Sequence, residues 1–168
     1  VTLQQATLVA RQTGTDFVLI CIPLFIFMGK LAHHAGIAAT LYDAIHKWVG
    51  RLPGGMAIAG VIACACFGAV TGSSVSSVAT MGSIIRPQLK KFGYDDTLST
   101  GTLAASGSLA ILIPPSVGFA FYGILTDTSI AALFIAGIVL GIMLSAFYVL
   151  GVLGRCIVNA KLFKRPIV

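Results

Sequence analysis

The sequence has 168 residues, of which 57% are hydrophobic and only 10% are charged, and its net charge is +6. Soluble domains carry roughly 25% charged residues, so this composition predicts an integral membrane protein built from α-helices. Nucleic-acid binding would require a basic face, whereas Lys and Arg here flank apolar runs. We therefore interpret them as topology signals and expect no nucleic-acid partner.

Residues 1–15 contain neither an initiator Met nor a signal peptide and look like the inside of a longer protein. Residues 16–36 are predicted to form a first transmembrane span, because 17–29 carry no charge and Lys30 can extend to the interface. In residues 37–50, apolar side chains recur at helical spacing and polar ones fall opposite them. This pattern predicts an amphipathic helix on the membrane surface, or else a short connector packed on protein.

Two pairs of potential metal ligands lie in this part of the chain. His33 and His34 are adjacent, and neighbours on a helix diverge by about 100°, so they cannot easily converge on one ion. Cys64 and Cys66 also point in different directions, with no further ligand nearby in sequence. We interpret the histidines as solvated interfacial residues and the cysteines as small buried hydrophobic residues.

Residues 52–87 are predicted to form a re-entrant helical hairpin. The run from 52 to 85 is uncharged, but two full crossings would need ~40 apolar residues and a turn. A polar tip at 71–77 separates a longer first arm from a second arm that is too short to cross and is expected to end near Pro87. A hairpin that enters and leaves on one face satisfies these lengths. Both of its mouths are basic, with Lys47 and Arg51 before it and Arg86, Lys90 and Lys91 after it.

Residues 96–126 are predicted to form a discontinuous span. No charge occurs from 97 to 126, yet the centre carries a Ser-Gly-Ser sequence and the pair Pro114-Pro115. Two prolines end a helix, and interrupted backbone in hydrocarbon is tolerated only where it lines a cavity or is buried in protein. We therefore expect two half-helices around a binding site, the first of them capped by Asp96.

Residues 128–154 form the last predicted span, in which the glycines of 137-x-x-x-141 permit close helix contact. A single topology accounts for the charges. If the chain starts outside, ten of the eleven Lys and Arg residues lie on or extend toward the cytoplasmic side, and only Arg11 lies outside.

The two polar interruptions offer neutral oxygen atoms. The hairpin tip carries five hydroxyls, and the prolines free carbonyls between Ala110 and Pro115. Such oxygens suit a small hard cation, and helix C-termini favour cations whereas N-termini favour anions. No carboxylate lies in either break, so we favour Na⁺ over a proton relay. The alternative is that these small residues only pack helices closely, but two such clusters favour a site.

Several segments resemble the large membrane subunit of tripartite ATP-independent periplasmic (TRAP) transporters. The resemblance extends from about residue 22 to about residue 150. Its segments are 22–29 (IPLFIFMG), 52–55 (LPGG), 68–74 (GAVTGSS), 93–94 (GY), 104–107 (AASG), 113–116 (IPPS) and 133–137 (LFIAG).

This resemblance implies an elevator-type carrier with an inverted repeat, of which this chain holds one half and is therefore a fragment. It implies Na⁺-driven uptake of an organic acid, such as a dicarboxylate or a sialic acid, across the bacterial inner membrane by a multi-pass permease. A soluble periplasmic binding protein would deliver the substrate, and a small membrane subunit would complete the transporter in the lipid bilayer.

The resemblance also implies where the ligands bind. The family's first Na⁺ site would fall on Thr71 and Ser73 with the carbonyls of Ala110, Ile113 and Pro115. The sequence departs from the family at two of these positions, since glycine is usual at 110 and serine is frequent at 71. We assign substrate contacts to four residues in or beside the breaks, Ser74, Ser106, Gly107 and Ser116.

Other functions fit the sequence less well. The apolar runs contain no Ser-His-Asp arrangement, HExxH sequence, phosphate loop or paired carboxylates, so we do not expect an enzyme. A channel would need a continuous polar stripe along several helices, whereas polar residues here gather at two breaks. A non-transporting membrane scaffold is the remaining alternative, and it would tolerate changes at the hairpin tip.

Overall fold

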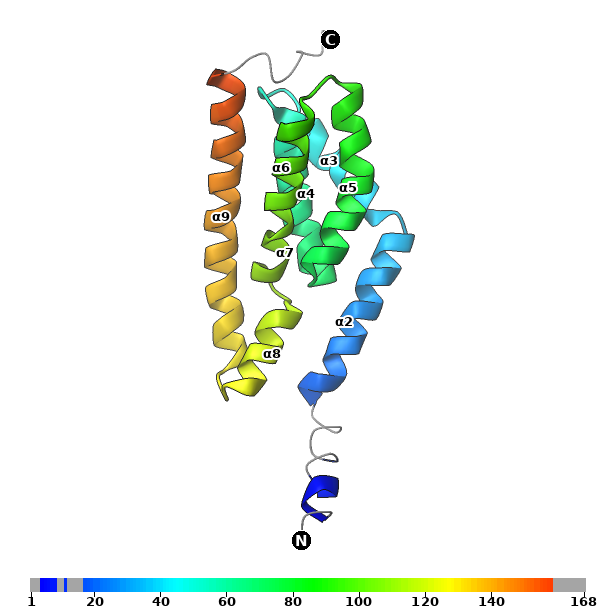
Figure 1. The fold of residues 1–168 in the computed structure, drawn as a ribbon, viewed down its shortest axis with the longest axis vertical. Coiled ribbons are helices and arrows are strands. Elements are labelled where there is room, and N and C mark those ends of the chain that lie inside the picture. Colours follow the sequence, from blue (N-terminus) through cyan, green and yellow to red (C-terminus); the bar gives the residue numbers. More distant parts are fainter. Residues whose placement is uncertain (1–3, 9–10, 12–16, 159–168) are drawn as a thin grey trace.

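The computed structural model describes residues 4–8, 11 and 17–158. This part of the chain is all-helical and contains no strand, as the composition predicts (Figure 1). The helices are α2 (Phe17–His34), α3 (Ile37–Val49), α4 (Gly55–Thr71), α5 (Ser74–Lys91), α6 (Asp96–Gly107), α7 (Leu109–Leu112), α8 (Val117–Leu125) and α9 (Ile130–Val158).

Helices α4 and α5 form a hairpin around Gly72 and Ser73. Its two open ends lie at the end of the molecule where α9 terminates, and its tip lies part-way along α9 (Figure 1). The second arm is longer than expected, because α5 continues through Pro87 to Lys91. Pro87 has no amide hydrogen to donate to the carbonyl of Ser83, so one helical hydrogen bond is lost. Both residues are exposed, and the surroundings can supply a replacement donor.

Helices α6, α7 and α8 follow one another as a broken rod. Residues 113–116 separate α8 from the others, and the two parts are bent by 45°. The residue that caps α6 is Asp95, whose carboxylate accepts hydrogen bonds from the amides of Thr97 and Leu98, so the prediction of Asp96 is wrong. Only Asp95 has the extended backbone that an N-cap requires, and Asp96 instead pairs with Arg86 at 3.7 Å.

Helix α9 is the one helix in the described ranges that is long and apolar enough on its own to cross a membrane, with 11% of its most apolar window buried. The bent pair of α6–α7 and α8 gives a second candidate if it counts as one span. Gly137 and Gly141 are buried where α9 passes the break, and a Cβ at Gly141 would lie 2.6 Å from Ile113 Cγ1. Their spacing thus permits close contact with the break.

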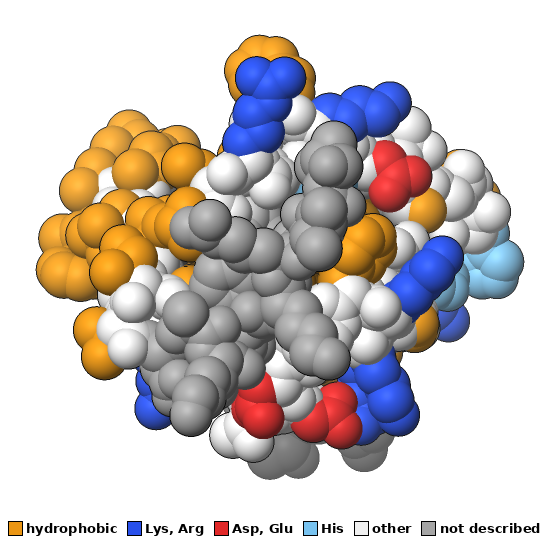
Figure 2. Space-filling model, turned by 90° about the horizontal axis from the view of Figure 1, so that it is seen from above, with side chains coloured by type: hydrophobic (Ala, Val, Ile, Leu, Met, Phe, Trp, Pro, Cys, Tyr) orange, Lys and Arg blue, Asp and Glu red, His pale blue; other side chains and the backbone are white. Residues whose placement is uncertain are grey.

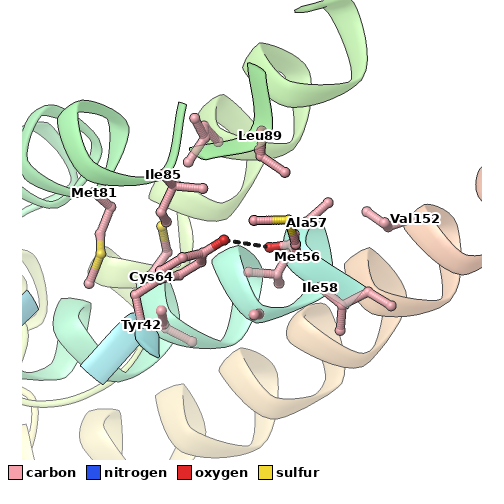
Figure 3. Packing of buried hydrophobic residues seen from close by; sticks show 14 of the residues in the cluster. Tyr42, Met56, Ala57, Ile58, Cys64, Met81, Ile85, Leu89 and Val152 are labelled. Atoms are coloured by element: carbon pink, nitrogen blue, oxygen red, sulfur yellow. Dashed lines mark hydrogen bonds between the residues drawn. The ribbon is translucent and has the colours of Figure 1, made fainter. Parts of the chain in front are cut away.

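Helix α4 lies at the centre, so the first arm of the hairpin is enclosed by protein (Figure 3). Tyr42 from α3 and Ile85 from α5 pack against it, and the Tyr42 hydroxyl donates to the carbonyl of Met56 at 3.4 Å. The neighbouring Cys64 is buried as expected. The prediction is wrong for Cys66, which is exposed, because alternate residues of one helix face different sides.

The exposed His33 ring is hydrogen-bonded through Nδ1 to the hydroxyl of Thr80 at 2.9 Å. His34 bonds the carbonyl of Lys30 at 2.9 Å, so the two rings have separate partners. No group of three or more His, Cys, Asp or Glu side chains suited to a metal occurs in the described residues. His33 therefore links α2 to α5, whereas the bond of His34 lies within α2.

Candidate ion site at two helix breaks

The hairpin tip and the proline break lie against each other. Gly72 has φ of +60°, and a Cβ added to it would lie 2.8 Å from the carbonyl oxygen of Pro115. A positive φ is a conformation that glycine adopts without penalty, and the missing side chain allows this close approach. The turn between α4 and α5 therefore needs glycine both for its positive φ and for its lack of a side chain. Together these allow the tip to pack directly on the break.

The approach continues one turn back along α4. A Cβ at Gly68 would lie 2.6 Å from Ala110 Cα and 2.7 Å from Ala110 Cβ, so α4 crosses α7 with almost no space between the backbones. On another side, a Cβ at Gly29 of α2 would lie 3.1 Å from Thr71 Cα. Glycines on two helices thus enclose the tip, and sequence reasoning assigned a role to neither.

Thr71 is at the centre of this contact and is 2% exposed. Its hydroxyl lies 2.6 Å from the hydroxyl of Ser77 and 3.2 Å from the carbonyl oxygen of Phe67. Ser77, on the first turns of α5, is fully buried, so the bond joins the two arms directly across the tip. Sequence reasoning counted Ser77 among the tip hydroxyls but did not assign it to the site.

Ser73 presents a hydroxyl that serves no structural purpose at the helix start. It is the N-cap residue of α5 with an extended backbone (φ −133°, ψ 122°), yet its side chain makes no capping bond. Serine at this position ordinarily accepts a hydrogen bond from the first turn. Ser73 is half-buried, and its hydroxyl is therefore not used in capping the helix that begins at the tip.

The three predicted carbonyl ligands are placed differently. The carbonyl oxygen of Pro115 faces the tip at Gly72. The carbonyl of Ala110 would take its helical hydrogen bond from residue 114, which is proline and has no amide hydrogen. Ile113 is the C-cap of α7 with an extended backbone, and its side chain packs on Gly141 of α9. The structure thus brings Pro115 and Ala110 to α4, whereas the side chain of Ile113 packs on α9 and against the buried core.

Four helix ends converge on this region. The C-termini of α4 and α7 supply the negative ends of helix dipoles, and the N-termini of α5 and α8 supply the positive ends. Neutral hydroxyl and carbonyl oxygens near two helix C-termini have the chemistry that a Na⁺ ion prefers. The segments that form the two breaks, residues 71–77 and 107–117, contain no Asp or Glu that would compete for this role.

The four predicted substrate residues separate into two pairs. Ser74 and Gly107 line one groove of about 580 Å³ between α5 and the α6–α7 segment. Ser106 and Ser116 are buried and bonded locally, since the Ser106 hydroxyl donates to the carbonyl of Leu103 at 3.1 Å and the Ser116 hydroxyl accepts from the amide of Phe119 at 3.5 Å. Only the first pair therefore lines a groove, and the second stabilises the helix ends.

The groove beside Ser74 is mostly apolar. Val75, Val78 and Ile111 line it with the serine, and Val75 is 79% exposed. Gly107 contacts the side chain of Val78, so a larger residue there would displace α5 from α6. A polar substrate held in this groove alone would meet few hydrogen-bonding groups. This face is consequently incomplete as a binding pocket.

A hairpin and a broken helix that meet inside an apolar helical bundle are features of membrane transport proteins that bind ions and substrates at interrupted helices. The comparisons agree with this class. The chain belongs to the DctM family, because the family model described as the tripartite ATP-independent periplasmic transporter DctM component matches residues 2–163. This match confirms the resemblance to TRAP large membrane subunits.

Individual relatives give the same assignment. The C4-dicarboxylate TRAP transporter large permease protein DctM of Pseudomonas aeruginosa is 40% identical over 133 residues, covering 79% of this chain and 31% of that protein. The ectoine/5-hydroxyectoine TRAP transporter large permease protein UehC of Ruegeria pomeroyi is 39% identical over 130 residues (77% and 30%). The 2,3-diketo-L-gulonate TRAP transporter large permease protein YiaN of Escherichia coli is 34% identical over 134 residues (79% and 32%). The chain thus spans about a third of the length of these relatives, which are transporter permeases and not enzymes.

Proposed function

We propose that this chain is part of a TRAP large permease subunit that couples Na⁺ entry to the uptake of an organic acid across the bacterial inner membrane. The observation that supports the ion site best is the contact between Gly72 and the carbonyl of Pro115, because it joins two interrupted helices beside unused oxygens. In this proposal, Na⁺ binds between the hydroxyls of Thr71 and Ser73 and the carbonyls of Ala110, Ile113 and Pro115.

The ion site and the substrate groove share the hairpin. Ser73 ends the turn from α4 and Ser74 begins α5, so an ion held at Ser73 fixes the position of Ser74 and of the positive helix N-terminus behind it. An anionic group can then bind at this N-terminus and at Gly107, with Ser106 and Ser116 stabilising the surrounding backbone. This adjacency offers a physical route for coupling, because each ligand orders a surface that the other uses.

The remaining parts of the transporter lie outside this chain. The rest of the permease would complete the substrate pocket over the apolar groove and supply the second half of the inverted repeat. A periplasmic binding protein and a small membrane subunit are the expected partners, and an elevator-type movement of the hairpin and broken helix is the expected mechanism. The relatives are named for different substrates, so the proposal extends to the class of the acid and not to one compound.

The test is uptake by proteoliposomes that contain the full-length permease, its small subunit and its binding protein. Uptake is measured with and without an inward Na⁺ gradient for the native protein and for the combined Thr71→Ala and Ser73→Ala variant. We expect native uptake to require Na⁺ and the variant to need a Na⁺ concentration at least about tenfold higher, since it loses two oxygen ligands. Unchanged Na⁺ activation in a folded variant would show that the ion binds elsewhere.

The scaffold and channel alternatives give different results in this assay. A scaffold would tolerate both substitutions and would show no Na⁺-dependent uptake of its own. A channel would pass substrate or ions without the binding protein and would not concentrate substrate against a gradient. The gathering of the hydroxyls at the tip, with Thr71 and Ser77 buried, favours a discrete site over a continuous pathway.

A further inference from the structure

A second hollow lies away from the breaks, between α6 and α9. This α6–α9 groove has a volume of about 430 Å³ and is lined on α6 by Thr97, Gly101 and Thr102 and on α9 by Tyr148, Gly151 and Arg155. The two helices run in opposite directions, so Thr97 and Arg155 lie at one end of the groove and Tyr148 lies toward the other. At that inner end the hydroxyls of Ser108 and Tyr148 are 3.2 Å apart.

The groove is hollow because each wall carries a glycine. A Cβ added to Gly101 or to Gly151 would meet no atom within 4 Å. Larger side chains at these positions would therefore extend into the groove without moving the backbone. The rest of the walls is largely apolar, with Leu98 and Phe147 among the lining residues. The groove has room for a flexible apolar chain but few polar groups along its length.

One end of the groove carries a guanidinium group. Arg155 is exposed, and the one ion pair within the described ranges joins Arg86 to Asp96, so no described carboxylate lies within 4.0 Å of the Arg155 guanidinium. Thr97, which lines the groove at this end, and Thr102, which lines it further along α6, are polar residues that accompany it. This end belongs to the face of the molecule seen in Figure 2, which shows Lys and Arg side chains around the rim, acidic side chains among them and a broad apolar patch on one side.

We infer that the α6–α9 groove binds a phospholipid, with its phosphate at Arg155 and an acyl chain lying toward Tyr148. Guanidinium groups pair with phosphate through two parallel hydrogen bonds, and basic pockets between transmembrane helices bind anionic lipid headgroups. The inference relies on the membrane setting of the proposed function but not on Na⁺ coupling. The groove has its charge at the interfacial end and apolar walls further in, which matches the order of headgroup and acyl chain in a phospholipid.

The occupant could instead be the remainder of the permease, since the relatives are about three times as long as this chain. A covering protein segment would exclude lipid from the groove, so the two occupants predict opposite results. The charge of Arg155 favours the lipid, because a covering helix would need a buried acidic partner to offset it. The experiment must therefore use the full-length permease with its small subunit.

The test is photolabelling in phosphatidylcholine vesicles that contain a phosphatidylglycerol with a diazirine on one acyl chain. We expect crosslinks in peptides 97–105 and 147–155, and an Arg155→Gln change should reduce them about tenfold at limiting probe through loss of a charge-assisted bond. Arg51→Gln, which removes an exposed basic residue outside the groove, is the matched charge control and should leave the labelling unchanged.

Filling the groove gives the decisive comparison. Gly151→Leu and, on the opposite wall, Gly101→Leu should each abolish the crosslinks. Gly154→Leu is the control, because Gly154 also lies on α9 with no atom within 4 Å of a Cβ but does not line the groove. The inference is overturned if the native protein is unlabelled at both walls, or if the filled variants label like the control. Labelling is measured without Na⁺ or substrate, so its failure is distinct from failure of the proposed transport.

Discussion

Alanine at Gly72 tests whether the contact between the tip and the break is functional. The substitution has two costs. First, a left-handed conformation costs a non-glycine residue roughly 1–2 kcal/mol. Second, the new Cβ would lie 2.8 Å from the Pro115 oxygen, so the break must shift away from the tip, and overpacking of this kind costs about 1–3 kcal/mol. We expect Gly72→Ala to lose about 2–5 kcal/mol of stability and to weaken Na⁺ activation.

Gly36 provides the control that separates the two costs. It has φ of +71°, close to that of Gly72, but a Cβ there would meet no atom within 4 Å. Gly36→Ala should therefore lose only the conformational part of the free energy of unfolding and keep its Na⁺ dependence. The assay is the melting temperature of each purified full-length variant, followed by uptake against external Na⁺ concentration. Equal losses of stability and equal Na⁺ activation in the two variants would refute the reasoning.

Three further predictions concern the cap of α6, the hydrogen bond across the tip and the topology of the hairpin. Asp95→Ala should destabilise the permease by about 1 kcal/mol through loss of the α6 cap, whereas Asp96→Ala should cost less because its ion pair is exposed, and thermal melting of both variants compares the two. Ser77→Ala should cost about 1 kcal/mol by removing the bond across the tip, again measured by melting, and an unchanged melting temperature would contradict that bond. In a cysteine-free background, Arg51→Cys and Lys91→Cys should both react with a membrane-impermeant thiol reagent from the cytoplasmic side only, and labelling from opposite sides would exclude the re-entrant hairpin.

The positions of the two breaks could be predicted because each depends on the backbone preferences of a few neighbouring residues. Two consecutive prolines cannot continue a helix, and the described helix α7 ends immediately before Ile113. A run of hydroxyl residues with a glycine likewise favours a turn, and Gly72 provides its positive φ. These signals depend on a few neighbouring residues, so no knowledge of the tertiary structure is needed.

Contacts between distant segments could not be predicted in the same way. Nothing in the sequence tells which glycine of α4 faces α7, and Gly68 is identified only by its contact with Ala110. The direction of each serine depends on the helix phase at its position, so Ser106 and Ser116 are buried although they have the same chemistry as the half-buried Ser74. Local backbone angles likewise decide which of two adjacent aspartates caps α6.

The packing of α2 on the tip constrains how the proposed site can move. Gly29 lies against Thr71, and His33 one turn further along α2 bonds Thr80 of α5, so α2 contacts both arms of the hairpin. A rigid-body movement of the hairpin relative to α2 would have to break this hydrogen bond and slide a threonine past a glycine. Loss of one part-buried hydrogen bond costs only about 1 kcal/mol, and glycine presents no side chain to obstruct the motion. The contact between α2 and the hairpin is therefore close but weakly held. The hairpin and the break are held more tightly, because Gly72 and Gly68 meet backbone atoms of the break, so we expect these two segments to move together as one unit.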